Sequence, residues 1–387
     1  MSDSPQERPP AKTIVFAGGG SGGHLFPGIA VAQTLAATGR PVHCLFVGSS
    51  RGVEQEIVRD HGFEHVALPV EPSSTMLSRP VRFANRLWQS TQAAQTLLPR
   101  CQASLVIGLG GFASVPVVWA ARLAGIPLVL LEQNVVPGRA TSWLCRRANL
   151  TCLGFSDAAR RLPRSAAHSV TGNPVRRPIA ALATESSNDG ERRSVVVLGG
   201  SQGSFALNEA FLGCVERMAE PFSHWRIVHQ TGARDVDHVR QRYAACGVRA
   251  EVASFFKDPV ELYRDAALAV SRAGALTLSE LACAGVPAVL IPYPKAIRNH
   301  QRLNAYAFEH VGAARVVRQS MDPEKTQAHL HDELAALLPN SELRSRMTRA
   351  MRSLARPDAA SVVADEVCKL LFSPQVSSPE EQSTQAQ

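Results

Sequence analysis

The chain has 387 residues, more than one domain usually holds, so two domains of about 150 to 200 residues each are expected. Its 45% hydrophobic and 19% charged residues are ordinary for a soluble globular protein. The net charge of +8 points to anionic partners such as phosphorylated small molecules or an acidic membrane surface. Nucleic acid is disfavoured as a partner, because the sequence contains no RNA-binding signature, zinc-finger spacing or lysine-rich tract.

The cysteines and the first residues predict a cellular compartment. Eight cysteines are scattered along the chain without a C-x-x-C pair or a metal-type spacing, which is typical of reduced thiols in a cytosolic protein. The polar start "MSDSPQERPPAK" has no apolar segment behind a basic one, so we expect no secretory signal.

A glycine-rich loop follows the first predicted strand, residues 13–16, and reads "FAGGGSGGHLFPG". Gly18, Gly20 and Gly23 fit G-x-G-x-x-G, but a dinucleotide site also needs an acidic residue about 20 positions later. No Asp or Glu occurs between Glu7 and Glu54, and the P-loop lysine is absent. The loop is therefore either a cradle for another phosphate group, before a helix that we expect Pro27 to open, or only a tight turn.

The stretch 103–121 has no charged residue and is long enough to span a bilayer. Gly108, Gly110, Gly111 and Pro116 would interrupt a spanning helix. We therefore predict a buried strand over 105–109, a loop, and a helix over 115–123.

Short apolar strands alternate with amphipathic stretches along the whole chain, which predicts an α/β protein with parallel sheets covered by helices on both faces. The strands before residue 160 are "TIVF", "HCLFVG", "SLVIGLG", "PLVLLE" and "LTCLGF", and those after it are "SVVVLGG", "WRIVHQ", "AEVASF", "ALAVSR" and "PAVLIPY". The segment "VVVLGGSQGSFALNEAFLG" repeats the strand, glycine loop and helix of the first half. The sequence therefore predicts two Rossmann-like halves hinged near residue 175.

These patterns give a division of the chain. The N-terminal domain covers 1–175 and the C-terminal domain 176–355, with a helix at about 356–372 that packs back on the N-terminal domain. The polar stretch 184–193 reads as a surface loop. The tail 373–387 is low in apolar residues and is expected to be disordered.

Seven motifs stand in the order and approximate spacing seen in the bacterial MurG family of glycosyltransferases, which this chain resembles over roughly residues 13 to 370. They are "GGGSGGHLFPGIAVA", "GLGGFASVP", "EQN", "GNPVR", "GGSQGS", "SRAGALTLSELACAGVPAVLIP" and "NHQRLNA". The resemblance implies a GT-B fold, in which two Rossmann-like doubly wound parallel-sheet domains face a cleft. It also implies transfer of N-acetylglucosamine from UDP-N-acetylglucosamine to undecaprenyl-linked lipid I, giving lipid II at the cytoplasmic face of the plasma membrane.

The family's product has a β1,4 linkage made from an α-linked donor, so the implied reaction inverts the anomeric centre and needs a general base. His24 is the candidate, because the positive end of a helix favours neutral imidazole. Alternatively, His24 only caps the turn or binds phosphate, and Glu132 is then the next candidate base. The acceptor diphosphate is assigned to two loops that contain Gly19, Gly20, Gly110, Gly111 and Ser114.

The resemblance also implies the donor site. Its candidate residues are Ser21, Gly22, Gly23, Asn134, Arg176, Ser201, Phe256, Ala275, Leu276, Thr277, Leu278, Ser279, Glu280 and Gln301. Glu280 corresponds to the residue that holds the ribose, Phe256 to the one whose backbone reads uracil, and Arg176 and Ser201 face the diphosphate. Ser21 replaces a threonine that is common in the family, and "YPKAIRNHQ" is irregular, which puts the register at Gln301 in doubt.

Two of these residues have structural alternatives. Thr277 and Glu280 fit the S/T-x-x-E pattern of a capping box, and Arg176 could be a surface arginine at a hinge. No D-x-D motif lies near the loops, so we expect neither a cofactor nor a fixed metal ion.

The segment 76–88, "MLSRPVRFANRLW", mixes Met76, Leu77, Val81, Phe83, Leu87 and Trp88 with Arg79, Arg82 and Arg86. Apolar anchors among arginines are typical of a peripheral surface that binds anionic lipid. The alternative is an ordinary amphipathic helix packed on the core.

Three other functions stay open for this sequence. They are another UDP-sugar transferase acting on a membrane lipid, a UDP-sugar epimerase of the same architecture, and a nucleotide-sugar sensor without turnover.

Overall fold

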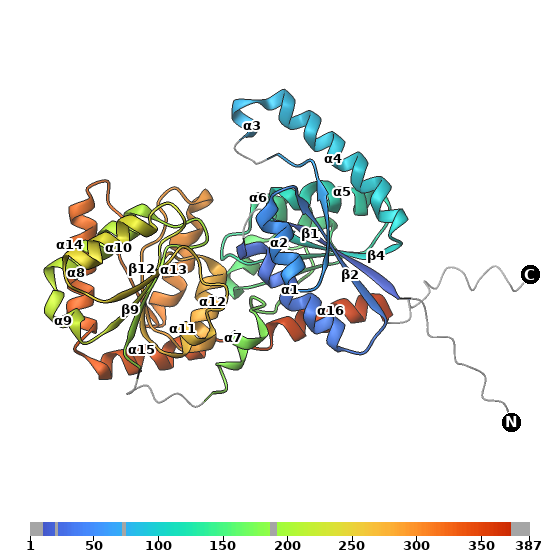
Figure 1. Cartoon of the computed structure of the whole chain (residues 1–387). Helices are drawn as coiled ribbons and strands as arrows, with labels where there is room; N and C mark the ends of the chain where they lie inside the picture. Colours follow the sequence, from blue (N-terminus) through green and yellow to red (C-terminus); the bar gives the residue numbers. More distant parts are fainter. Residues whose placement is uncertain (1–10, 20–21, 72–74, 186–191, 373–387) are drawn as a thin grey trace, which may run out of the picture.

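The computed structural model describes residues 11–19, 22–71, 75–185 and 192–372. They form two lobes, each built around one parallel sheet (Figure 1). The first sheet has seven strands in the order β3-β2-β1-β4-β5-β6-β7. Its strands are β1 (Lys12–Gly18), β2 (Val42–Ser49), β3 (Glu64–Leu68), β4 (Ala103–Gly110), β5 (Leu128–Glu132), β6 (Leu150–Leu153) and β7 (His168–Val170).

The second sheet has six strands in the order β10-β9-β8-β11-β12-β13. They are β8 (Ser194–Leu198), β9 (Arg226–Gln230), β10 (Ala250–Ala253), β11 (Ala266–Ser271), β12 (Ala288–Leu290) and β13 (Ala314–Val316). Every residue of the central strands β8 and β11 is buried, because helices cover both faces of the sheet. The predicted doubly wound α/β architecture is confirmed.

Helices connect these strands and flank both sheets (Figure 1). In the first lobe they are α1 (Gly22–Ala37), α2 (Gly52–Asp60), α3 (Thr75–Ser78), α4 (Pro80–Arg100), α5 (Val115–Leu123) and α6 (Arg139–Leu144), with short 3₁₀ turns η1 (Phe112–Ser114), η2 (Cys145–Arg147) and η3 (Ser156–Arg161). From the crossing onward they are α7 (Arg177–Ala181), α8 (Phe205–Arg217), α9 (Ala219–Ser223), α10 (Val236–Ala245), α11 (Val260–Arg264), α12 (Ala275–Ala284), η4 (Ile297–Asn299), α13 (His300–His310), α14 (Pro323–Leu337), α15 (Ser341–Ser353) and α16 (Ala359–Phe372).

Each sheet reverses its strand order at one point, and this is where ligands bind in folds of this kind. In the first sheet the reversal lies between β1 and β4, and in the second between β8 and β11. Both predicted glycine loops leave the carboxyl ends of strands at these points, one after β1 and the other after β8.

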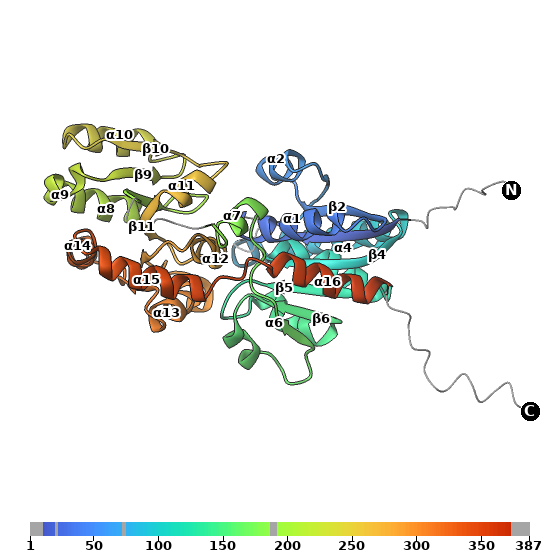
Figure 2. The ribbon, with the colours of Figure 1, turned by 90° about the horizontal axis from the view of Figure 1, so that it is seen from below.

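The chain passes between the lobes twice, once between β7 and α7 and once between α15 and α16. After the second crossing, α16 returns to the first lobe and packs along α1 (Figure 2). The place of this helix agrees with the sequence prediction, whereas the exact domain boundary at residue 175 stays a prediction.

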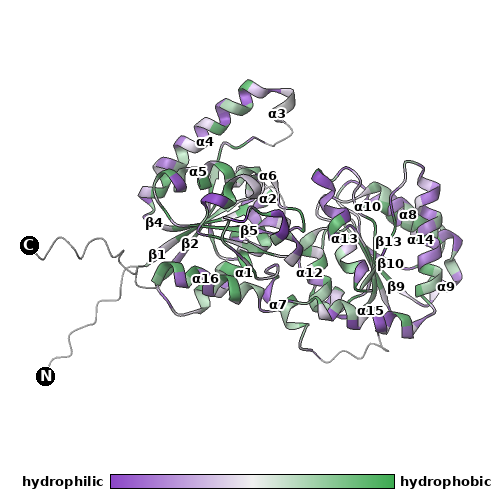
Figure 3. Ribbon diagram, turned by 180° about the vertical axis from the view of Figure 1, so that it is seen from behind, coloured by the Kyte–Doolittle hydropathy of each residue, from purple (hydrophilic) through white to green (hydrophobic). Residues whose placement is uncertain are grey.

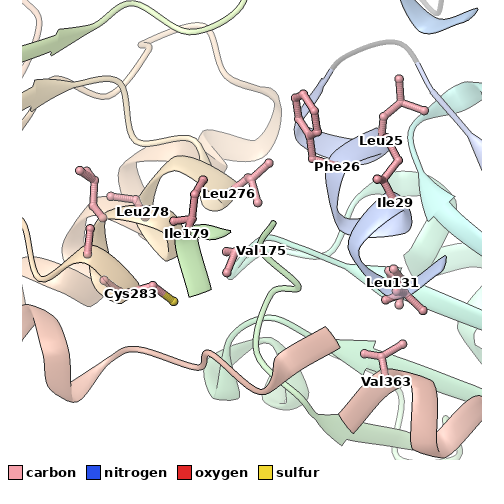
Figure 4. Close-up of a cluster of buried hydrophobic side chains, with 14 of the residues drawn as sticks. Leu25, Phe26, Ile29, Leu131, Val175, Ile179, Leu276, Leu278, Cys283 and Val363 are labelled. Carbon is pink, nitrogen blue, oxygen red and sulfur yellow. The ribbon is translucent and has the colours of Figure 1, made fainter. Parts of the chain in front are cut away.

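Apolar residues also meet between the lobes (Figure 4). Leu25 and Phe26 of α1 lie on one side, Leu276 of α12 lies on the other, and Val175 of the first crossing lies between them. Val175 is buried. The predicted hinge region is therefore packed into the core.

Two predictions about the first lobe have different outcomes. The stretch 103–121 forms β4, η1 and α5, as expected, and none of the helices in the described ranges is long and apolar enough to cross a membrane. The expectation that Pro27 opens the first helix is wrong, because α1 begins at Gly22 and Pro27 lies inside it. The missing N–H of Pro27 leaves the carbonyl of Gly23 without its helical partner.

Candidate active site

A cleft of about 310 Å³ lies where the carboxyl ends of the two sheets face each other. Twelve of the predicted residues line it: Gly22, Gly23, His24, Asn134, Arg176, Ser201, Phe256, Ala275, Leu276, Thr277, Glu280 and Gln301. They come from both lobes and from the first crossing. Gly20 and Ser21 lie outside the described residues.

His24 is in the first turn of α1, and its ring lies against the end of β4. Nδ1 is 3.1 Å from the carbonyl oxygen of Leu109 and 3.1 Å from Oε1 of Gln133. Both partners are acceptors, so Nδ1 carries the hydrogen and donates it. In the neutral ring Nε2 is then the nitrogen without a hydrogen, which is the arrangement that a general base requires.

The loop after β4 makes room for this ring. Gly110 and Gly111 have φ angles of 91° and 72°, which side chains on other residues disfavour. A Cβ at Gly110 would lie 3.2 Å from Nδ1 of His24. The buried Ser114 donates its hydroxyl to the carbonyl of Gly111 and so stabilises the loop.

Of the residues assigned to the acceptor phosphates, Gly110 and Gly111 adjoin His24, and Gly19 and Ser114 lie against Gly111. None of these four residues lines the cleft itself. Their role in acceptor binding stays a prediction.

Glu132, the alternative base, is buried at the end of β5. Its Oε1 accepts hydrogen bonds from the backbone and side-chain amides of Asn134, and its Oε2 accepts one from the backbone N–H of Gly138. These bonds fix the loop that follows β5. The geometry therefore favours a structural role for Glu132 over proton transfer.

Glu280 and Arg176 meet at the floor of the cleft. Arg176 donates to Oε1 of Glu280 at 3.0 Å and to the carbonyl of Lys257, and its guanidinium lies 4.5 Å above the ring of Phe26. Tyr263 donates its hydroxyl to Oε2 of Glu280 at 2.9 Å. Burial raises the pKa of Tyr263, which keeps the phenol protonated as a donor.

The reading of Arg176 as a surface arginine is wrong, because this side chain is largely buried and bridges α1 and α12. The capping-box reading is also wrong. Helix α12 begins after Gly274, so Thr277 lies inside its first turn and is not the cap.

The α12 residues do not all face the cleft. Helical geometry turns Leu276, Thr277 and Glu280 toward it and Leu278 and Ser279 away from it. Leu278 is fully buried in the core, and Ser279 accepts a hydrogen bond from Asn173. The expectation that every residue from Ala275 to Glu280 lies along the donor is therefore corrected for Leu278 and Ser279.

The remaining donor candidates already have hydrogen-bond partners. The N–H of Phe256 donates to Oε1 of Gln230 at 3.2 Å, and Oε1 of Gln301 accepts from the N–H of Tyr293 at 2.9 Å. Ser201 is exposed at the rim. A uracil that bonds to the amide of Phe256 would have to displace Gln230.

A buried arginine supports the second glycine loop. Arg272 lies at the end of β11 and donates twice to Oγ of Ser204, which caps α8, and once to the carbonyl of Ile291. Burial lowers the pKa of Arg272 to about 10. A positive charge therefore lies beside the loop that the resemblance assigns to the donor diphosphate.

Sequence reasoning missed several residues of the cleft, among them Phe26, Gln133, Gln230, Tyr263 and His300. His300 donates from Nδ1 to the carbonyl of Ile297 at 2.8 Å. Gln133 could have been found, since it lies between two assigned residues of the "EQN" motif. Phe26 and His300 likewise lie inside two of the seven motifs, close to His24 and directly before Gln301. Gln230 and Tyr263 are brought to the cleft by tertiary structure and carry no local signal.

Two further expectations concern ions and lipid. The residues that the structure describes contain no group of three or more His, Cys, Asp or Glu side chains that could hold a metal ion, and the expected absence of a fixed metal stays a prediction.

In α4, hydrophilic and hydrophobic residues alternate (Figure 3). Val81 and Trp88 are exposed, but Phe83 is buried and packs on Phe112, so Phe83 is not a lipid anchor.

The arginines of α4 are not all alike. Arg82 forms an ion pair with Glu71 at 2.8 Å, and Arg86 lies 4.0 Å from the same carboxylate. Arg79 is exposed at the start of the helix. The side chains of Met76 and Leu77 lie outside the described part of the structure.

Comparison with known proteins decides the family. Residues 14–152 match the glycosyltransferase family 28 N-terminal domain, and residues 194–363 match the C-terminal domain of that family. The UDP-N-acetylglucosamine--N-acetylmuramyl-(pentapeptide) pyrophosphoryl-undecaprenol N-acetylglucosamine transferase of Syntrophotalea carbinolica is 38% identical, over 92% of this chain and 98% of the relative. The protein of the same name from Aeromonas hydrophila is 38% identical over 95% and 99%. The chain belongs to the MurG family.

Solved structures agree with this assignment. The crystal structure of Acinetobacter baumannii MurG superposes with a TM-score of 0.72 at 29% identity, covering 92% of this chain and 99% of that one. The calicheamicin glycosyltransferase CalG4 (TM-score 0.64, 16% identity, 94% and 100% covered) and the UDP-GlcNAc 2-epimerase of Neisseria meningitidis (0.63, 11%, 92% and 100%) share the fold alone. The predicted GT-B fold and the glycosyltransferase family are confirmed, while the role of each MurG-type site residue stays a prediction.

Proposed function

We propose that this chain transfers N-acetylglucosamine from UDP-N-acetylglucosamine to the C4 hydroxyl of the muramyl sugar of undecaprenyl-pyrophosphoryl-MurNAc-pentapeptide (lipid I), producing lipid II for peptidoglycan synthesis. Family membership over nearly the whole chain supports the substrates, because the relatives' names state both of them. The observation that carries the chemistry is the free Nε2 of His24, which lines the same cleft as the α12 residues.

In this reaction the acceptor hydroxyl oxygen attacks the anomeric carbon from the face opposite the diphosphate. Its proton passes to Nε2 of His24, and the bond from the anomeric carbon to the phosphate oxygen breaks. The electron pair of that bond leaves with UDP, which gives inversion in one step.

The departing diphosphate is stabilised by charges of the C-terminal lobe. The start of α8 follows the second glycine loop and supplies backbone N–H groups. Arg272 adds a buried positive charge behind the same loop, and Arg176 adds a second from the floor of the cleft. These groups can stabilise the negative charge of the departing UDP, so no fixed metal ion is required. Addition of EDTA should therefore leave turnover unchanged.

We place this reaction at the cytoplasmic face of the plasma membrane, with the protein bound peripherally. The lipid-linked acceptor requires access to a bilayer. Val81 and Trp88, exposed on α4 beside Arg79, are the surface that we assign to anionic lipid.

Purified protein, lipid I and UDP-N-acetylglucosamine test the proposal, with lipid II detected by mass spectrometry. UDP-galactose with diacylglycerol serves as the matched alternative pair. Lipid II formed only from the first pair is the expected result. Transfer to diacylglycerol, conversion of the donor without acceptor, or UDP binding without turnover would instead establish the lipid transferase, the epimerase or the sensor.

A further inference from the structure

Gln133 is the side chain that contacts the catalytic candidate most directly. It follows β5 and is 3% exposed, and its amide lies against the imidazole of His24. Its Nε2 donates to the carbonyl of Leu109 at 3.0 Å, which turns Oε1 toward Nδ1 of His24 at 3.1 Å. The carbonyl of Leu109 thus accepts from both side chains.

The contacts among His24, Gln133 and the carbonyl of Leu109 allow only one placement of the hydrogens. A backbone carbonyl only accepts, so the amide nitrogen of Gln133 faces Leu109 and its oxygen faces His24. Nδ1 therefore has two acceptors and must carry the hydrogen, and the lone pair is left on Nε2. In histidine sites the group bonded to one ring nitrogen generally sets the state of the other.

The segment that carries Gln133 is held by one group from the first crossing between the lobes and by another from the donor-side lobe. Its backbone carbonyl accepts from Asn173, whose side-chain amide also donates to Ser279 of α12. Two residues further on, the N–H of Val135 donates to the buried Asn304 of α13 at 3.0 Å. The orientation of Gln133 therefore depends on contacts with the donor-side lobe.

We propose that Gln133 is a positioning residue that, together with the carbonyl of Leu109, fixes the tautomer of His24, and that Asn173 and Asn304 hold it in place when the lobes are together. This inference rests on the proposed function, because it assigns Gln133 a part in proton transfer by His24. Nothing in the sequence pattern alone distinguishes this amide from a residue that only packs.

The charged groups around the His24 ring decide whether a change in the pH dependence of kcat can be attributed to position 133. The first turn of α1 has no acidic residue, and the carboxylate of Glu132 is bonded to the amides of its own loop. Across the cleft, Arg176 and Glu280 are paired with each other, and His300 lies on the far lobe. The described partners of the imidazole are thus a backbone carbonyl and a neutral amide, so a carboxylate at position 133 would be a new charge at that ring.

The test compares Gln133→Glu and Gln133→Met with wild type, and uses Gln241→Glu on the exposed face of α10 as the matched control. The glutamate stabilises the imidazolium, so the acid limb of the kcat profile should move to higher pH while KM for UDP-N-acetylglucosamine stays unchanged. The methionine should lower kcat by about 10- to 100-fold, as is typical when a group that orients a functional histidine is lost. Gln241→Glu should match wild type.

Nitrogen NMR of His24 in the apo protein provides a second readout that needs no turnover. We expect hydrogen on Nδ1 in wild type and a larger share of the Nε2–H tautomer in Gln133→Met, where only the carbonyl of Leu109 still accepts from Nδ1. This readout also decides the matter if the glutamate variant does not fold. An unchanged tautomer in Gln133→Met, or pH profiles that superpose on wild type, would overturn the inference. Failure of the proposed function looks different, because the wild-type protein itself would then form no lipid II, whereas the tautomer of His24 could still be measured.

Discussion

Glu280 is engaged on both of its oxygens before any nucleotide binds, by Arg176 on one side and Tyr263 on the other. Glu280→Gln should therefore weaken UDP binding by about 10- to 100-fold and also lower stability, since hydrogen bonds to charged groups are worth about 1.5–3 kcal/mol. Calorimetry with UDP and urea unfolding measure the two effects. Tyr263→Phe is the control, because it removes one partner of the carboxylate and keeps its charge.

In that control, stability should fall while most of the UDP affinity remains. If Glu280→Gln lowered stability and bound UDP as wild type does, Glu280 would be structural and the ribose assignment would be wrong.

His229 gives the protein a stability that depends on pH. It is fully buried between Tyr243 and Asn208, and burial lowers its pKa to about 3. The unfolded chain takes up a proton near pH 6.5, whereas the folded chain does not, so stability is complete above that pH and falls as the pH drops toward 3. Protonation of His229 in the unfolded chain should lower the free energy of unfolding by about 2 kcal/mol between pH 7 and pH 5.

Urea unfolding at a series of pH values tests this expectation. His229→Gln should be less stable at pH 7 but should lose less stability on acidification than wild type does. The exposed His310→Gln is the control and should keep the wild-type slope. Equal slopes in the His229 variant and wild type would show that another group titrates.

Helix α4 is the element on which membrane binding depends. Arg82 and Arg86 lie near Glu71, which offsets part of their charge, while Arg79 is exposed. Basic residues near an anionic surface contribute about 1 kcal/mol each. Arg79→Ser should therefore weaken binding to anionic vesicles more than Arg82→Ser does, and neither change should affect neutral vesicles.

Vesicle sedimentation measures this binding, and Trp88→Ala tests the apolar anchor in the same assay. Trp88→Ala should weaken binding to both vesicle types, because it removes apolar area that inserts. Identical binding to anionic and neutral vesicles, before and after the arginine changes, would leave α4 as an ordinary packed helix.

At the level of elements, the sequence predicted every described strand except β3, β7 and β13. Strands β3, β7 and β13 lie at or near sheet edges, where alternating burial gives a weak signal in three to five residues. The start of α12 was uncertain because its S/T-x-x-E pattern is genuine but lies inside the helix. Leu278 and Ser279 turn away from the cleft, which a linear motif cannot indicate.

Across the whole molecule, most of the cleft could be predicted because its residues lie in motifs at the ends of strands. The contacts that orient them could not, because they join residues far apart in the chain. Gln133 reaches Leu109, and Asn304 reaches Val135 from the other lobe. Such pairs form only when both sheets are in place.

Two kinds of contact join the lobes, and they should differ in strength. Lys257 lies 3.4 Å from both Glu56 and Asp60 of α2, but all three side chains are exposed. Asn304 is fully buried. Lys257→Ala should change the free energy of unfolding by about 0–1 kcal/mol. Asn304→Ala, which leaves buried groups unpaired, should cost about 1–3 kcal/mol.

Urea unfolding in low and high salt tests whether Asn304→Ala lowers stability more than Lys257→Ala does. Only the small contribution of Lys257 should decrease with salt, because its charges are screened. A larger loss in Lys257→Ala than in Asn304→Ala would mean that surface ion pairs hold the lobes together.

We expect His24, at the junction of the two lobes, to remove the proton from the acceptor hydroxyl. The most direct measurement is kcat for lipid II formation by wild type, His24→Ala and His24→Gln, with UDP affinity measured in parallel and His300→Gln as the control from the opposite lobe. A general base contributes about 100- to 10,000-fold in rate, so both His24 variants should be slower by that order. Their UDP affinity should be nearly intact, and His300→Gln should turn over far faster than either. Turnover near the wild-type rate in His24→Gln would contradict the account and show that His24 only positions a substrate.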